Sequence, residues 1–114
     1  MQTTTNNTKG KEIALEIIAQ LGANKFFSMT GSLVKYYDND GSLTLKLRRN
    51  KAKAQYLRIE LANDDTYTMR FFKVQSKTLE NITIEYFSRV YCDQLQTTFT
   101  KVTGLLTSLG TMGK

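Results

Sequence analysis

The chain of 114 residues contains no histidine, no proline and no tryptophan, and it has a single cysteine, Cys92. Without histidine, the commonest general base and the commonest transition-metal ligand are both missing. A zinc site needs several cysteine and histidine ligands, which one thiol cannot supply. We therefore expect a protein without catalytic residues, metal or cofactor, and we exclude zinc enzymes and histidine-dependent hydrolases.

Long apolar runs are also missing. No segment approaches the eighteen or so apolar residues that a membrane span needs. The first ten residues, MQTTTNNTKG, are polar and lack the apolar centre of a signal peptide. The one cysteine cannot form an internal disulfide, which is consistent with a reducing compartment. We expect a cytoplasmic location, inside a host cell, with no membrane partner.

What is present fits one folded domain. Hydrophobic residues make up 40% of the chain and charged residues 23%, as in ordinary globular proteins. We predict a single domain over residues 9–109, with flexible tails at 1–8 and 110–114. The formal charge of +6 favours polyanionic partners, with nucleic acid as the first candidate.

Hydrophobic periodicity predicts the α+β fold class. A helix should begin after Thr8 and end near Gly22, because its apolar residues recur every three or four positions. Beyond it the period changes to two in six short runs: KFFSMT, SLVKYY, SLTLKLR, QYLRIELA, TYTMRFFKV and NITIEYF. A last helix should cover Val90–Thr103, bury Tyr91, and stop at Gly104. We expect an antiparallel sheet of four to five strands with both helices on one face.

Alternation within the runs predicts which side chains share a face. Those expected to point toward the helices are Leu43, Leu45, Leu47, Leu57, Ile59, Leu61, Tyr67, Met69, Phe71, Ile82 and Ile84. Their neighbours would occupy the other face, which would include Phe87 as an exposed aromatic residue. The DNDG stretch at 38–41 lacks the spacing of a calcium loop, and we interpret it as a hairpin turn.

The stretch LTLKLRRNKAKAQYLRIEL, residues 43–61, carries six of the sixteen cations. On the predicted solvent face, cations from three strands would lie among aromatic rings, the arrangement on which single-stranded nucleic acid stacks its bases. The segment RRNKAK, which joins two of the predicted strands, would contact the phosphate backbone. The predicted nucleic-acid-binding residues are Lys46, Arg48, Arg49, Lys51, Lys53, Tyr56, Arg58, Arg70 and Phe72.

Two alternatives remain open. The same residue types are typical of any solvated strand face, and exposed aromatic residues also occur in homo-oligomer interfaces. The turn after Leu61 leaves the strand register undecided: a three-residue loop places Arg58 opposite Arg70, whereas a five-residue loop pairs Glu60 with Arg70. Because facing cations repel one another, the first register would favour binding of a polyanion.

Several spaced motifs resemble a known family: KEIALEIIAQLGANKFFSMTG, LTLKL, KAKAQYLRIELANDDTYTMRF and VYCDQLQTTFTKVTGLLTSL. They are similar to small proteins of bacteriophages and mobile elements that share a Met-Thr-Gly turn, an Asp-Thr-Tyr hairpin and a Tyr-x-Asp-Gln-Leu helix ending in Thr-Gly-Leu. The resemblance covers residues 9–109. It implies a phage-type origin and an accessory role, and it assigns no functional residue because the family has no assigned activity.

These observations favour a small non-enzymatic phage accessory protein that forms homo-oligomers and binds DNA or RNA, preferably single-stranded. The alternative is a module that binds a host or phage protein, such as a defence inhibitor or a virion component.

Overall fold

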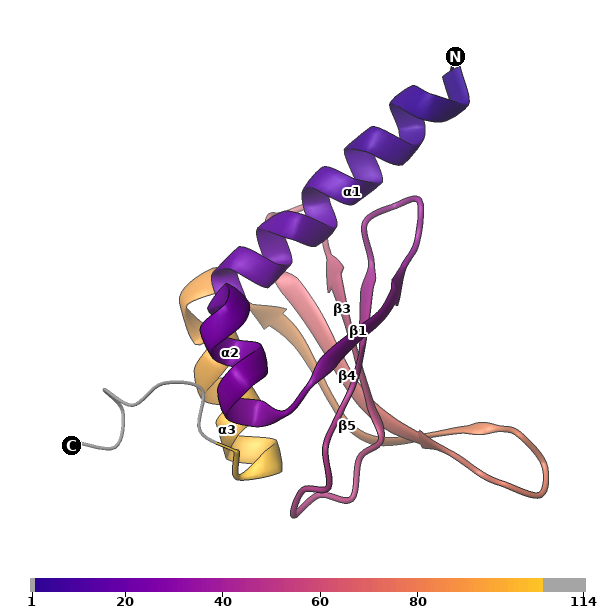
Figure 1. Cartoon of the computed structure of the whole chain (residues 1–114), viewed down its shortest axis with the longest axis vertical. Helices are drawn as coiled ribbons and strands as arrows, with labels where there is room; N and C mark the ends of the chain where they lie inside the picture. The colour runs from indigo at the N-terminus through magenta and orange to yellow at the C-terminus, as the bar shows by residue number, and fades with distance from the viewer. Residues whose placement is uncertain (1, 106–114) are drawn as a thin grey trace.

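The computed structural model describes the backbone of residues 2–105 and the side chains of residues 10–105. Its elements are α1 (Gln2–Leu21), α2 (Ala23–Thr30), β1 (Leu33–Tyr37), β2 (Leu43–Lys46), β3 (Tyr56–Leu61), β4 (Tyr67–Val74), β5 (Asn81–Val90), a short 3-10 helix η1 (Cys92–Gln94) and α3 (Leu95–Thr103). Figure 1 shows the α-helices on one side of the sheet, which confirms the predicted α+β architecture. The predicted tail at 110–114 lies outside the described residues.

The five strands form one antiparallel sheet in chain order, β1-β2-β3-β4-β5. Its loops therefore lie alternately at two ends. The turns β1–β2 and β3–β4 lie at one end, and the loops β2–β3 and β4–β5 lie at the other (Figure 1). The DNDG turn is confirmed, with the Gly41 N–H donating to the Asp38 carbonyl at 2.8 Å.

The core lies between the helices and the inner face of the sheet. Phe26 of α2 packs edge-on against Phe99 of α3, with ring centroids 4.9 Å apart, and Phe99 also contacts Phe71 of β4. Most of the predicted inward-facing residues are buried, but Leu61 and Ile82 near strand ends are exposed. Burial of such large side chains is the main stabilising contribution to the fold.

The KFFSMT run is not a strand, contrary to the prediction. It forms α2, which buries Phe26 and Thr30 on one face, four residues apart. Gly22, with φ of 120°, separates α2 from α1, and Gly31 closes α2 in the left-handed conformation. The two glycines enclose a segment that is long enough for two helical turns, and the packing of Phe26 selects the helix.

The first helix is longer than predicted and the last one is shorter. α1 begins at Gln2, so residues 2–8, which were predicted as a flexible tail, belong to this helix. At the other end of the domain, β5 continues to Val90, and α3 begins only at Leu95. Tyr91 is exposed, contrary to the prediction, whereas the stop at Gly104 is confirmed because this residue is the left-handed cap of α3.

Two irregularities in β5 change which residues share a face. Phe71 pairs with Glu85 but Phe72 pairs with Thr83, so Ile84 is an extra residue in β5. A second shift lies between Tyr67 and Met69. Because each extra residue reverses the alternation of the strand, Phe87 packs against the core and not on the outer face as predicted.

Candidate nucleic-acid interface

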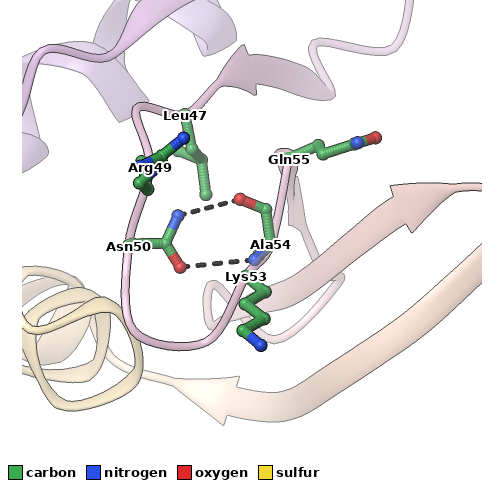
Figure 2. A pocket seen from close by; sticks show the side chains of 6 residues that line it. All are labelled: Leu47, Arg49, Asn50, Lys53, Ala54 and Gln55. Carbon is green, nitrogen blue, oxygen red and sulfur yellow. Dashed lines mark hydrogen bonds between the residues drawn. The ribbon is translucent and has the colours of Figure 1, made fainter.

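The connection between β2 and β3, residues 47–55, is the most basic segment, and we call it the basic loop. Its centre is organised by Asn50, whose side chain is buried. The Asn50 amide donates to the carbonyls of Arg48 and Ala54, and its oxygen accepts from the N–H groups of Ala52 and Ala54. Figure 2 shows the two bonds between Asn50 and Ala54 that close the loop across its middle.

All four cations of the basic loop are exposed: Arg48, Arg49, Lys51 and Lys53. Two of them lie over helix ends, since the Arg48 side chain covers Gly31 and the Lys51 side chain covers Gly104. There they complement the partial negative charge of the helix C-termini. Arg49 and Lys53 extend to opposite sides of the Asn50–Ala54 bonds (Figure 2). These two cations are the ones best placed to meet an external anion.

Arg49 and Lys53 border an open hollow of about 550 Å³. Its remaining lining residues are Leu47, Asn50, Ala54 and Gln55. The Gln55 side-chain oxygen accepts from the Val74 N–H at 2.9 Å, which leaves its amide NH₂ as a hydrogen-bond donor. A hollow lined by apolar side chains and by the amides of Asn50 and Gln55, with two flanking cations, can hold a flat base and the phosphates beside it.

The face of the sheet opposite the helices is called the outer face. It carries Lys46, Arg58 and Arg70, as predicted, and the register places Arg58 opposite Arg70. Arg58 is not free, however. Its guanidinium lies 2.9 Å from the Asp38 carboxylate and 2.6 Å from that of Glu60. Burial of the guanidinium opposes its charge, but the hydrogen bonds to Glu60 and Asp38 outweigh this and raise the pKa of Arg58.

The predicted stacking residues are already stacked on each other. The rings of Tyr56 and Phe72 lie 5.4 Å apart with an interplanar angle of 28°. Lys35 covers Tyr56 and Arg70 covers Phe72, at 5.4 and 5.0 Å from the ring centroids. Phe72 is only 7% exposed, so its ring is not accessible to a base. This ladder of two cations and two rings stabilises the outer face itself.

Other aromatic rings on the outer face are accessible. Tyr36 pairs with Thr44 and Tyr86 pairs with Arg70, and both tyrosines are exposed. Tyr86 was not predicted as part of this face, because alternation continued from Ile82 and Ile84 would turn it inward and the bulge at Ile84 leaves no mark in the sequence. Tyr36 and Lys35 were missed for a related reason, since β1 has its own register shift between Val34 and Tyr36.

Charge is divided between the two ends of the sheet. The turns β1–β2 and β3–β4, with the adjoining strand residues, carry Asp38, Asp40, Glu60, Asp64 and Asp65. The loops at the other end carry Arg48, Arg49, Lys51, Lys53 and Lys77, with Glu80 as the acidic residue of the β4–β5 loop. We call this second end the basic end. We call the first end the acidic end. Among residues 10–105, both ion pairs involve Arg58 and lie at the acidic end.

Within the described part of the chain, no group of acidic residues and cysteine could hold a metal ion, and no helix is long and apolar enough to cross a membrane. No family model, curated protein or solved structure matches the chain.

Proposed function

We propose that this protein is a small non-enzymatic accessory protein of phage type that binds nucleic acid at the basic end of its sheet. The observation that carries the proposal is the basic loop. It presents exposed, unpaired Arg49 and Lys53 on a backbone that Asn50 holds in place. A preformed loop loses little conformational entropy on binding, so its phosphate contacts contribute more of their energy to affinity.

The outer face beside the loop supports a preference for single strands. Tyr36 and Tyr86 are exposed there, and Lys46 and Arg70 lie on strands between them. A single strand that leaves the basic loop across this face would find rings for its bases and cations for its phosphates. Arg58 is assigned a structural role in this proposal, because two carboxylates already neutralise it.

Fluorescence anisotropy with a labelled single-stranded DNA, the matching duplex and the matching RNA tests the proposal across a salt series. The test variant is Arg49→Ala/Lys53→Ala. The control is Lys11→Ala/Lys25→Ala, which removes the same charge from exposed positions on α1 and α2. Each lost contact to a single strand should reduce the slope of log affinity against log salt by about 0.7. Equal slopes in the two variants would overturn the assignment to the basic loop.

A second candidate function rests on β1. This edge strand has five residues, all exposed, and four of them are apolar or aromatic: Leu33, Val34, Tyr36 and Tyr37. Exposed edges of this kind pair with strands of other chains. A second copy, or a host or phage protein, could extend the sheet here. Sedimentation equilibrium of the protein and of Val34→Lys tests the homo-oligomer, which should be lost in the variant.

A further inference from the structure

The β4–β5 hairpin extends beyond the rest of the sheet at the basic end. The last pair of β3 with β4 joins Tyr56 and Phe72, whereas β4 and β5 continue to the pair Val74 and Asn81. In Figure 1 this hairpin projects away from the helices. Its turn is ordered: the Gln75 N–H donates to the Glu80 carbonyl at 2.8 Å, and the Leu79 N–H donates to the Gln75 carbonyl at 2.7 Å.

Leu79 is an unusual residue for its position in that turn. It is 76% exposed, the largest value for a large hydrophobic side chain among residues 10–105. Its backbone has φ of 61°, the left-handed conformation that glycine and asparagine adopt with least strain. Leucine here therefore gains almost no burial and strains the backbone. A residue that is unfavourable on both grounds in the free protein is better explained by a contact with another molecule.

The surroundings of Leu79 indicate which partner this is. Lys77 lies in the same turn, Lys73 lies near the end of β4, and Glu80 is the acidic neighbour. The strands that carry the hairpin also carry Arg70 and Tyr86 on the outer face. An apolar tip on a basic hairpin that continues an aromatic surface fits a strand of nucleic acid, whose phosphates and base faces alternate.

We propose that Leu79 is an apolar wedge that packs against a base of the bound strand where this strand leaves the outer face, with Lys77 on the adjacent phosphate. In complexes with duplex DNA, apolar side chains inserted between neighbouring bases partly unstack them, and the same contact is available on a single strand. The inference rests on the proposed nucleic-acid binding and adds a second contact, separate from the basic loop. The two backbone hydrogen bonds of the turn, Gln75 to Glu80 and Leu79 to Gln75, would hold the wedge in position.

The experiment uses single-stranded DNA in which one adenine is replaced by 2-aminopurine, whose fluorescence rises when it is unstacked. The protein should increase this fluorescence at one position of the strand. Leu79→Asn should abolish the increase and weaken binding by about tenfold, while the salt dependence is unchanged because no cation is lost. Leu79→Gly should behave in the same way. Leu61→Asn, an exposed leucine at the acidic end, is the matched control and should bind normally.

Urea unfolding separates a loss of contact from a loss of fold. The Asn and Gly variants of Leu79 should unfold at the same or a higher urea concentration than the natural protein, since both relieve left-handed strain. If the natural protein binds the strand but Leu79→Asn binds it equally well with equal fluorescence, the wedge is wrong and the proposed function stands. If the natural protein binds no nucleic acid, both fail. The wedge would also be wrong if Leu79→Asn lost binding to anionic lipid vesicles but kept its binding to the DNA strand.

Discussion

Arg58 of β3 and Asp38 of the β1–β2 turn form an ion pair with 2.9 Å between guanidinium nitrogen and carboxylate oxygen. The pair joins the edge of the sheet to its centre across β2, and Glu60 adds a second carboxylate at 2.6 Å. This arrangement removes the repulsion between Arg58 and Arg70, which face each other in the register. The cation most central to the outer face therefore serves the fold.

Arg58→Ala should consequently change the stability of the protein, whereas Lys46→Ala should change its nucleic-acid binding. Arg58→Ala should lower the free energy of unfolding by about 1 kcal/mol, because both of its carboxylate partners are well exposed and screened by solvent. It should leave the salt slope of nucleic-acid binding unchanged. Lys46 is exposed, so Lys46→Ala should leave stability unchanged and reduce the slope. Urea titration and anisotropy measure the two effects, and a reduced slope in Arg58→Ala would contradict the structural assignment.

Asn50 should be required for both stability and binding, although it carries no charge. Asn50→Ala removes four hydrogen bonds and leaves the buried Ala54 backbone groups without their partner. We expect a loss of about 2 kcal/mol in the free energy of unfolding. Nucleic-acid affinity should fall as well because Arg49 and Lys53 lose their fixed positions. Asn63→Ala, in the exposed β3–β4 turn, is the control and should change neither quantity.

Much of this fold could be predicted because it depends on local pattern. Leu43 and Leu45, then Leu57 and Ile59, alternate cleanly and are buried as expected. Gly104 ends the last helix because glycine adopts its left-handed conformation without strain. Such features need no knowledge of distant residues.

The errors arose where distant contacts decide the outcome. Phe87 faces the core because of an extra residue at Ile84, and nothing in the local sequence marks that bulge. Arg58 was expected to be available because its partner Asp38 lies twenty positions away in sequence. The cations of the basic loop could be located from the sequence because this loop is one continuous segment. The arrangement of the outer face could not, because it is assembled from five strands.

Gly41 should tolerate substitution much less well than Gly104, although both have positive φ, at 90° and 78°. A Cβ at Gly41 would overlap the side chain of Ile13 on α1, so Gly41→Ala should push α1 away from the β1–β2 turn. At Gly104 the nearest atoms belong to the flexible Lys51 side chain, 3.3 Å away. We expect losses of about 3 kcal/mol for Gly41→Ala and about 1 kcal/mol for Gly104→Ala. Equal losses in urea titration would contradict this packing of α1.

Acid should destabilise the protein through its turn aspartates. The Ser42 N–H donates to the Asp40 carboxylate, and Thr66 donates to the Asp64 carboxylate through its hydroxyl and its N–H. These bonds hold the pKa of both carboxyl groups below their ordinary 3.8. Because the folded pKa is the lower one, the stability that they contribute is present above about pH 4 and is lost as the pH falls through the folded pKa. Urea midpoints between pH 7 and pH 2 should show this fall, and Asp64→Asn should make it smaller. An unchanged profile in that variant would contradict the role of Thr66.

Thr44 offers a test in which a substitution should stabilise the protein. Its side chain is 1% exposed on the outer face, and its hydroxyl oxygen has no hydrogen-bond partner among the described residues. A buried hydroxyl without a partner costs about 1 to 3 kcal/mol, and valine has nearly the same shape without the polar group. Thr44→Val should therefore raise the free energy of unfolding by about 1 kcal/mol. Thr66→Val is the matched control: the buried Thr66 hydroxyl donates to Asp64 at 2.6 Å, so its loss should destabilise the protein. If Thr44→Val instead destabilises the protein, the hydroxyl has a partner in solution, and an ordered water on the outer face would be the first to seek.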